Sequence, residues 1–300
     1  MVNYPLRSLM FVPAHNEKLI QGVIRFDADV IVLDLEDSVQ PFQMKQVARD
    51  NAEKYIKQGL FKNYKVFIRV NDLESGQILK DVHQLTIEGV EGFLCPKVRT
   101  GKDVYFFDKL IETIECEKNI AKNSFKIIPI IETTASVLNA QDICKASDRV
   151  IAIAFGSEDF ITDMHGIHDE EALTLFTARA LIVLAARANN VAPIDTACIN
   201  VHDNEDLERN LILAKKLGFE GMFVLSPKQL PLVHKYFTPS EKEIIEAKEM
   251  LKLSEEAEKE AKGVAIMDGK FIGPPLVERA KNILKKYQTI LNKQNYVKNE

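Results

Sequence analysis

Eight short apolar runs alternate with helix-length amphipathic segments up to about residue 237, and this alternation is the strongest constraint on the fold. The runs cover residues 7–13, 30–37, 65–71, 92–98, 126–132, 149–156, 192–200 and 221–227. They are rich in β-branched and other apolar residues with little strict alternation, as is typical of strands buried on both faces. Eight strand–helix units in series predict a (β/α)8 TIM barrel over residues 1–237, with a doubly wound open sheet as the alternative.

The alternation of apolar runs and amphipathic segments stops before Pro239, and a different sequence pattern follows. Ser240 to Lys262 reads as a long charged helix, with Ser240 and Glu243 forming a capping box. The pair Asp268-Gly269 then predicts a hairpin, and a last helix follows. We therefore expect residues 238–300 to form a C-terminal helix–hairpin–helix extension. The apolar positions of its first helix are sparse, which suits either a solvated helix or one that packs on a neighbouring subunit.

Composition and charge exclude several classes of protein. The net charge is -5 with both signs interspersed, which argues against a nucleic-acid or polybasic membrane-surface protein. The amino terminus lacks the pattern of a signal peptide, and no apolar run approaches about 18 residues. The four cysteines lie far apart without a C-x-x-C pair, which predicts free, buried thiols. We expect a cytoplasmic protein.

Two acidic residues follow neighbouring predicted strands. Glu132 closes the run 126–132, and Asp159 follows the run 149–156 after a short Gly-Ser-Glu turn. In a barrel the active site lies at the carboxyl ends of the strands, and adjacent strands are about 4.8 Å apart. Two carboxylates, completed by water and substrate oxygens, suit Mg²⁺ better than Zn²⁺. The alternative for Glu132 is a simple cap on the following helix.

Other polar residues fall at the same strand ends. Arg69 lies inside the apolar run 65–71, where a charge requires partners, and its planar fork suits a substrate carboxylate. Glu36 and Asp37 end the second run. Further strand-end polar residues are Asp34, Asn71, Lys97, Glu158, Asp195 and Asn200. Together they imply a small anionic acid that chelates the metal as substrate.

Several short motifs occur in one order along the chain. They are RSLMFVPAH, DLEDSV, VARDNA, FIRVN, CPKV, IPIIET, FGSEDF and the APID strand. With these motifs the chain resembles the citrate lyase beta subunit family, in the HpcH/HpaI aldolase superfamily, whose relatives include malyl-CoA and citramalyl-CoA lyases. The resemblance covers nearly the whole chain.

The resemblance implies a Mg²⁺-dependent barrel enzyme, usually a homotrimer, that cleaves a carbon–carbon bond beside an acyl thioester. The substrate would be a hydroxyacyl-CoA such as citramalyl-CoA or malyl-CoA, cleaved to a 2-oxo acid and acetyl-CoA. By matching motif, Glu132 and Asp159 would bind the metal, and Glu132 would also contact substrate. Arg69 would bind the substrate carboxylate, and Arg7 would lie near the thioester carrier or the 2-oxo acid.

The chain departs from the family pattern at three places. Gly273 stands where many relatives carry the aspartate of a C-terminal M-I-D-x-P motif, a residue thought to handle the proton on the enolate carbon. Ser226 stands in a Leu-Ser-Pro where relatives often have Ile-His-Pro, and Asn200 replaces a common aspartate. These departures leave two alternatives open: an aldolase acting on free 2-oxo acids, and a weakly active or non-catalytic ligand-binding subunit of a lyase complex.

Overall fold

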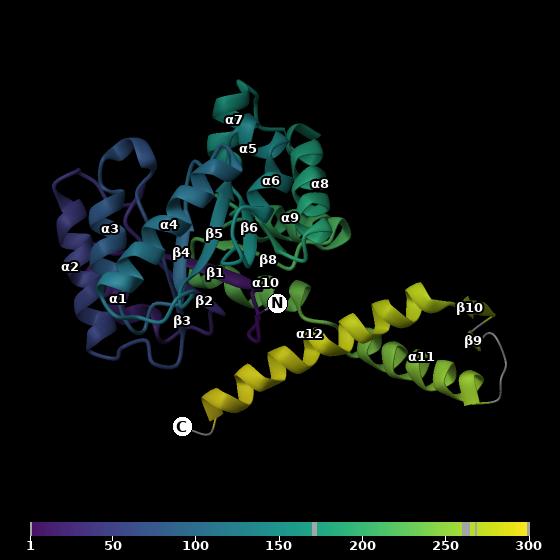
Figure 1. Ribbon diagram of the computed structural model, residues 1–300. Coiled ribbons are helices and arrows are strands. Elements are labelled where there is room, and N and C mark those ends of the chain that lie inside the picture. The colour runs from purple at the N-terminus through teal and green to yellow at the C-terminus, as the bar shows by residue number, and fades with distance from the viewer. Residues whose placement is uncertain (1, 170–172, 260–264, 268, 299–300) are drawn as a thin grey trace. The chain divides into compact units, whose positions relative to one another are not determined.

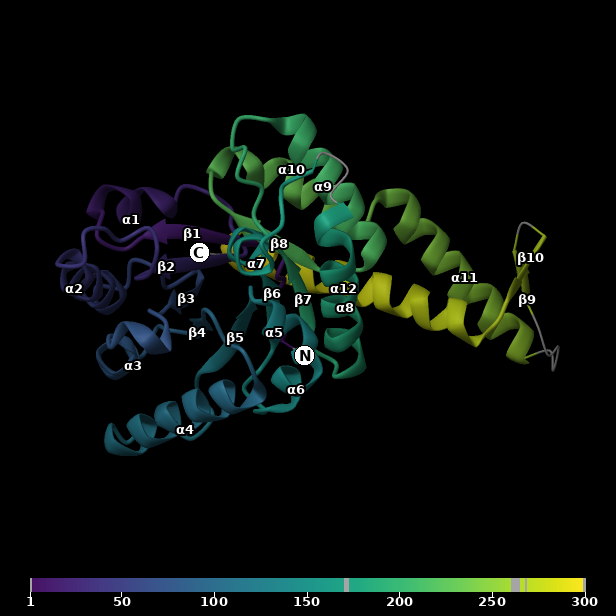
Figure 2. The same cartoon turned by 90° about the horizontal axis from the view of Figure 1, so that it is seen from above.

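Eight parallel strands form a closed barrel in the computed structural model, which describes residues 2–169, 173–259, 265–267 and 269–298. Each strand pairs with the next along the chain, and β1 pairs with β8 to close the ring (Figures 1 and 2). The strands are β1 Ser8–Pro13, β2 Val30–Asp34, β3 Lys65–Arg69, β4 Gly92–Cys95, β5 Lys126–Ile131, β6 Ala152–Phe155, β7 Ala192–Asp195 and β8 Gly221–Val224. The predicted (β/α)8 barrel is confirmed. The open sheet is wrong, because it would leave β1 and β8 unpaired.

The strands are shorter than the apolar runs that predicted them. In β2 every residue from Val30 to Asp34 is buried, and the strand ends there because the Asp34 carboxylate accepts the main-chain N–H of Glu36 at 2.9 Å and starts a turn. Strand β6 begins at Ala152 rather than Arg149. The Arg149 side chain instead forms ion pairs with Asp108 and Glu115, at 2.6 and 2.5 Å.

Helices surround the barrel between successive strands (Figure 2). They are α1 Glu17–Val23, α2 Met44–Lys57, α3 Ile78–Leu85, α4 Gly101–Glu117, α5 Thr134–Leu138, α6 Ala140–Lys145, α7 Ser157–Met164, α8 Leu173–Ala188, α9 Asn204–Leu217 and α10 Leu230–Phe237, with 3-10 turns at Leu73–Ser75 and Pro227–Gln229. Local signals set their ends. Asp203 caps α9 through the N–H groups of Glu205 and Asp206, and Gly218 ends it with φ +102°.

The chain divides into two compact units, Leu6–Val233 and Val2–Pro5 with His234–Glu300. In the second unit α11 (Glu241–Lys259) packs against α12 (Pro274–Lys298) and buries Ile244 and Ala247. The capping box is confirmed, with Ser240 N–H donating to Glu243 at 2.8 Å and Glu243 N–H donating to Ser240 at 3.2 Å.

The predicted hairpin also forms. Strands β9 (Ala265–Met267) and β10 (Lys270–Ile272) are antiparallel, and Gly269 adopts φ +74°, a conformation that favours glycine. Asp268, the other half of the turn signal, lies outside the described residues.

All four cysteines are free thiols, and three are buried as expected. Cys116 is exposed, contrary to expectation. Within the described ranges no helix has the length and apolar content to cross a membrane.

Candidate active site at the carboxyl end of the barrel

Arg69, the last residue of β3, closes a two-pronged ion pair with Asp34, the last residue of β2. The two residues are register partners in the parallel ladder, so their side chains leave adjacent strands at the same height. Nε and Nη2 of Arg69 lie 2.6 Å from Oδ1 and Oδ2 of Asp34, respectively. Burial raises the pKa of Asp34, but the charge and hydrogen bonds of Arg69 outweigh burial and hold this pKa below its usual value. Asp34 is therefore ionised and fixes the plane of the guanidinium group.

The remaining nitrogen of Arg69 contacts two further carboxylates. Nη1 lies 3.0 Å from Oε2 of Glu36 and 3.1 Å from Oδ2 of Asp37. The Phe11 ring of β1 lies below the guanidinium carbon at 4.7 Å, a cation–π contact. Glu36 is buried, whereas the Asp37 side chain is 55% exposed. Burial raises the pKa of Glu36 to about 7 despite the nearby Arg69 charge, so its carboxyl exchanges a proton near neutral pH.

Glu132 follows β5 and is buried at the same end of the barrel. Its Oε1 accepts the main-chain N–H of Lys97 at 2.5 Å, and its own N–H donates to Ser136 at 3.1 Å. The absence of a side chain at Gly156 makes room for it: a Cβ there would lie 2.6 Å from Oε2 of Glu132. Burial and the negative charges of Glu36 and Asp159 together raise the pKa of Glu132 to about 8.

Asp159 lies in the first turn of α7, which begins directly after β6 and Gly156. Burial raises the pKa of Asp159, as does the negative charge of Asp37, while the positive charges of Lys97 and Arg69 lower it. Its neighbour Glu158 is exposed and lies 3.1 Å from Nε2 of His168. Of this acidic pair, Asp159 is thus the residue that shares the electrostatic environment of Glu132.

Arg7 and three of the predicted strand-end residues bind other partners. Arg7 precedes β1 and so lies at the amino end of the barrel, where Nε and Nη2 donate to Asp29 at 2.8 and 2.7 Å. The remaining three have structural partners: Asn71 donates to Asp81, Asp195 pairs with buried Arg179, and Asn200 donates to Asp206.

The donor set fits a hard divalent cation. Glu132 and Asp159 offer carboxylate oxygens, and each has a pKa raised by burial and by like charges, a combination that a bound cation would relieve. In the described parts of the chain no group of three His, Cys, Asp or Glu side chains is arranged so that it could hold a metal ion by itself. The other ligands would have to be water or substrate oxygens, which is how Mg²⁺ is commonly bound.

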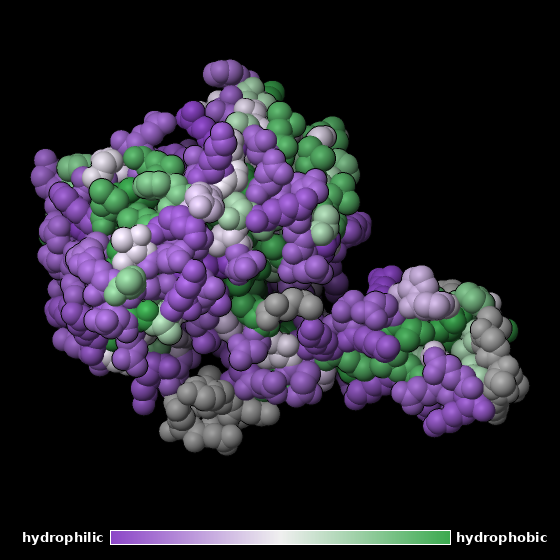
Figure 3. Space-filling view, viewed as in Figure 1, coloured by the Kyte–Doolittle hydropathy of each residue, from purple (hydrophilic) through white to green (hydrophobic). Residues whose placement is uncertain are grey.

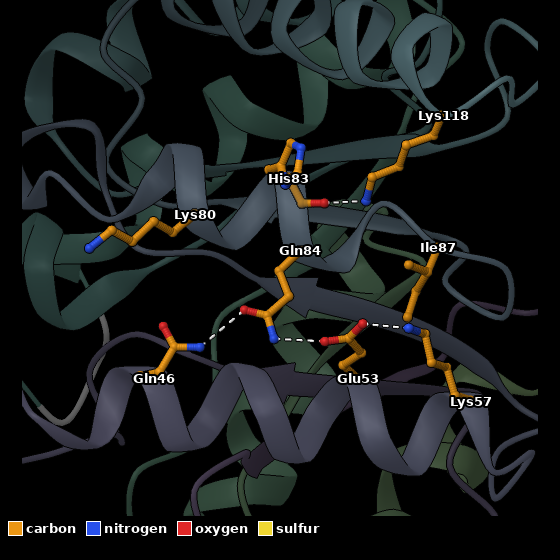
Figure 4. Close-up of a pocket in the computed structure, with 8 residues that line it drawn as sticks. All are labelled: Gln46, Glu53, Lys57, Lys80, His83, Gln84, Ile87 and Lys118. Atoms are coloured by element: carbon orange, nitrogen blue, oxygen red, sulfur yellow. Dashed lines mark hydrogen bonds and ion pairs between the residues drawn. The ribbon is translucent and has the colours of Figure 1, made fainter.

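A separate hollow lies on the outside of the barrel, between α2 and α3 and the end of α4 (Figure 4). Its polar side chains already bind one another: Gln84 donates to Glu53 at 2.8 Å, Lys57 donates to Glu53 at 2.6 Å, and Lys118 donates to the carbonyl of His83. It holds none of the residues singled out from the sequence. The chemistry of the carboxyl end, rather than the presence of a hollow, identifies the candidate site.

Fold and site together define a (β/α)8 barrel whose mouth gathers buried carboxylates around one arginine. Residues 7–227 match the HpcH/HpaI aldolase/citrate lyase family, and the chain belongs to this family of aldolases and lyases.

Relatives of both lyase types are similar to it over most of their length. The chain is 32% identical over 280 residues to the citrate lyase subunit beta of Haemophilus influenzae. This match covers 93% of this chain and 96% of that protein. It is 29% identical over 301 residues to L-malyl-CoA/beta-methylmalyl-CoA lyase of Rhodobacter capsulatus, with 93% of each covered. Among solved structures, the protein CitE from Mycobacterium tuberculosis in complex with magnesium, acetoacetate and coenzyme A superposes with a TM-score of 0.75 at 21% identity. That match covers 96% of this chain and 100% of the other, and so shares the fold.

Proposed function

We propose that the chain is a Mg²⁺-dependent carbon–carbon lyase that acts on a hydroxyacyl-CoA, such as citramalyl-CoA or malyl-CoA, and yields a 2-oxo acid and acetyl-CoA. The observation that supports this most is the arginine fork fixed by Asp34 at the same end of the barrel as Glu132 and Asp159. Family membership and the names of the lyase relatives are consistent with it.

In this proposal Glu132 and Asp159 hold Mg²⁺, and Arg69 binds the carboxylate of the substrate. Asp37 is the exposed partner of Arg69 Nη1, so the incoming carboxylate takes its place while Asp34 keeps the guanidinium plane fixed. When bound, Mg²⁺ supplies a Lewis acid that polarises substrate oxygens. The Lys97 N–H holds one oxygen of Glu132 and so fixes the direction of its carboxylate.

The bond that breaks joins the hydroxyl-bearing carbon to the carbon beside the thioester. The hydroxyl loses its proton, the carbon–oxygen double bond of the 2-oxo acid forms, and the electron pair of the broken bond passes to the thioester as its enolate. Protonation of the enolate carbon then gives acetyl-CoA. In this proposal Glu36, which can exchange a proton near neutral pH and lies against Arg69, accepts the hydroxyl proton.

Gly273 favours a second candidate, aldol cleavage or condensation of free 2-oxo acids. Glycine has no acid to deliver a proton to an enolate carbon, and cleavage of a free 4-hydroxy-2-oxo acid does not require the C-terminal aspartate found in many lyase relatives. The same residue leaves a third candidate, a ligand-binding subunit of a lyase complex. The complete carboxylate set around Arg69 supports an active enzyme over this third candidate.

One experiment separates the three. The purified protein is incubated with Mg²⁺ and citramalyl-CoA, malyl-CoA or a 4-hydroxy-2-oxo acid, and the release of pyruvate or glyoxylate is followed. Release from a thioester that Glu132→Ala abolishes supports the lyase. Turnover of the free acid alone supports the aldolase. Mg²⁺-dependent pyruvate binding without any turnover supports the binding subunit.

We also infer a homotrimer in which the C-terminal unit contacts a neighbouring subunit. Phe271 and Ile266 are register partners across the β9–β10 ladder, and both are exposed, at 59% and 65%. Helix α8 carries further exposed apolar residues, namely Leu173, Phe176, Leu181 and Leu184. Figure 3 shows apolar (green) atoms over this helix. Exposed apolar surfaces of this kind mark protein interfaces. Sedimentation equilibrium tests the inference, and a monomer at micromolar concentration would refute it.

A further inference from the structure

Lys97 adopts a backbone conformation that is unusual for a residue with a side chain. Its φ is +53°, in the left-handed region, where residues other than glycine carry a steric cost. It follows β4 in the segment Cys95-Pro96-Lys97. Strained backbone of this kind persists where surrounding contacts fix it, often at functional sites.

The left-handed turn aims the main-chain N–H of Lys97 at Glu132. The donor lies 2.5 Å from Oε1, a charge-assisted hydrogen bond to a buried carboxylate. Because Gly156 packs against the other oxygen of Glu132, this N–H and Gly156 together determine the direction of the carboxylate.

The side chain of Lys97 reaches a second group of carboxylates. Nζ lies 3.3 Å from Oε1 of Glu36 and 3.6 Å from Oδ2 of Asp72. Oε1 of Glu36 is buried, and no hydrogen bond of good geometry reaches it from the described part of the chain, so the Lys97 ammonium group is its nearest charge partner. The other oxygen of Glu36 contacts Arg69 at 3.0 Å. Lys97 thus connects Glu132, through its backbone, to the Glu36–Arg69 pair, through its side chain.

We propose that Lys97 is a positioning residue of this site: its backbone orients Glu132 toward the cation, and its ammonium group holds Glu36 against Arg69 and supplies positive charge for an anionic substrate. The proposal rests on the proposed function, since it takes Glu132 as a metal-binding group and Arg69 as the carboxylate-binding group.

Loss of the ammonium charge should have opposite effects on the two ligands, which general damage to the fold would not produce. Removing the ammonium charge beside a cation site strengthens the binding of a divalent cation and weakens the binding of an anion. For Lys97→Met we expect the Kd of Mg²⁺ to fall about threefold or more, while the Kd of pyruvate, measured with Mg²⁺ present, rises about tenfold. Lys97→Arg keeps the charge and should restore both values toward those of the wild type.

The backbone role is tested by two uncharged variants. Lys97→Gly favours the left-handed turn, whereas Lys97→Val disfavours it because its side chain is β-branched. Since neither carries the ammonium group, a difference between them reports on the backbone conformation at position 97 and not on its charge. Lys97→Val should bind Mg²⁺ about fivefold or more weakly than Lys97→Gly.

Isothermal titration calorimetry with Mg²⁺, and then with pyruvate, measures these constants on the full chain, and thermal unfolding without metal confirms that each variant folds. Lys102→Met removes an exposed lysine from the first turn of α4 and serves as the charge control; it should change neither constant. Equal weakening of both ligands in Lys97→Met, no change in either, or equal Mg²⁺ binding by the glycine and valine variants would each overturn the proposal. If the wild type itself fails to bind Mg²⁺, or Glu132→Gln binds it equally well, the proposed function fails instead.

Discussion

Arg69 and Asp34 form a two-pronged ion pair across adjacent barrel strands, with both nitrogen–oxygen distances at 2.6 Å. Both groups are largely withdrawn from water, with side-chain exposures of 13% and 1%. Asp34 therefore depends on Arg69 to offset its charge, and Arg69 depends on Asp34 for its orientation. The pair fixes the plane of the guanidinium group that we propose binds the substrate carboxylate.

Arg69→Met should destabilise the protein by about 3–5 kcal/mol, because it leaves the Asp34 charge buried without its partner. Urea unfolding measures the loss. The double variant Asp34→Asn/Arg69→Met also removes the buried, unpaired charge of Asp34. It should recover part of the stability that Arg69→Met loses. A double variant no more stable than Arg69→Met would contradict the prediction that the unpaired Asp34 charge causes the loss.

The contribution of Asp34 should vary with pH in a defined direction. Its pKa is lower in the folded protein than in the unfolded chain, so between the two values the unfolded state binds more protons and stability rises with pH. The stability difference between wild type and Asp34→Asn should be full above the unfolded pKa of about 3.9 and should shrink as the pH falls below it. Urea unfolding of both proteins from neutral pH downward measures this difference. A constant difference at every pH would contradict the prediction.

Mg²⁺ should stabilise the protein through Glu132 and Asp159. After treatment with a chelator, addition of Mg²⁺ at about 100 times its Kd should increase the free energy of unfolding by about 2.7 kcal/mol. Glu132→Gln and Asp159→Asn should lose this increase. Glu158→Gln is a matched control, because Glu158 precedes Asp159 in the chain but contacts exposed His168 instead. Differential scanning calorimetry of the four proteins with and without Mg²⁺ gives the answer, and an equal response in Glu132→Gln would contradict the assignment.

The barrel could be predicted from the sequence because strands buried on both faces give continuous apolar runs. Their ends could not, since these depend on side-chain contacts made in three dimensions. The predicted strand at 149–156 begins only at Ala152, as Arg149 is held by acidic partners from α4. Apolar content alone does not distinguish the first residue of a strand from the residue that anchors it.

The sequence could likewise predict that Arg69, Glu132 and Asp159 lie at one end of the barrel, because the carboxyl ends of parallel strands share that end. It could not predict the Asp34–Arg69 fork, which depends on the register of β2 against β3. Nor could it predict the left-handed turn at Lys97. The placement of Arg7 could have been predicted from the sequence. Arg7 comes before the apolar core of its run, so it belongs to the amino end of the barrel, where it pairs with Asp29.

Gly156→Ala should disturb the site with little effect on the rest of the barrel. A Cβ at this position would lie 2.6 Å from Oε2 and 2.8 Å from Cβ of Glu132, so the carboxylate has to move. We expect a loss of about 1–3 kcal/mol in stability and a marked weakening of Mg²⁺ binding by calorimetry. Gly22→Ala in α1 is the control, because its Cβ would meet the flexible end of Arg25 at 3.2 Å. Unchanged Mg²⁺ binding in Gly156→Ala would mean that Glu132 does not bind the metal in this orientation.

Gly273→Asp tests whether the C-terminal unit can be given a proton-transferring group. A Cβ at Gly273 would lie 2.6 Å from Cε1 of Phe271, but this ring is 59% exposed and can rotate away. If the proposed lyase reaction is limited by protonation of the enolate carbon, the new carboxylate should raise kcat for thioester cleavage, since a positioned acid or base contributes about 10²–10⁴. Gly273→Asn has the same size without the acid and should give no increase. Should Gly273→Asp fold and bind Mg²⁺ normally yet show no gain, the proton is handled elsewhere, and cleavage of a free 4-hydroxy-2-oxo acid becomes the better account of a chain that carries glycine at this position.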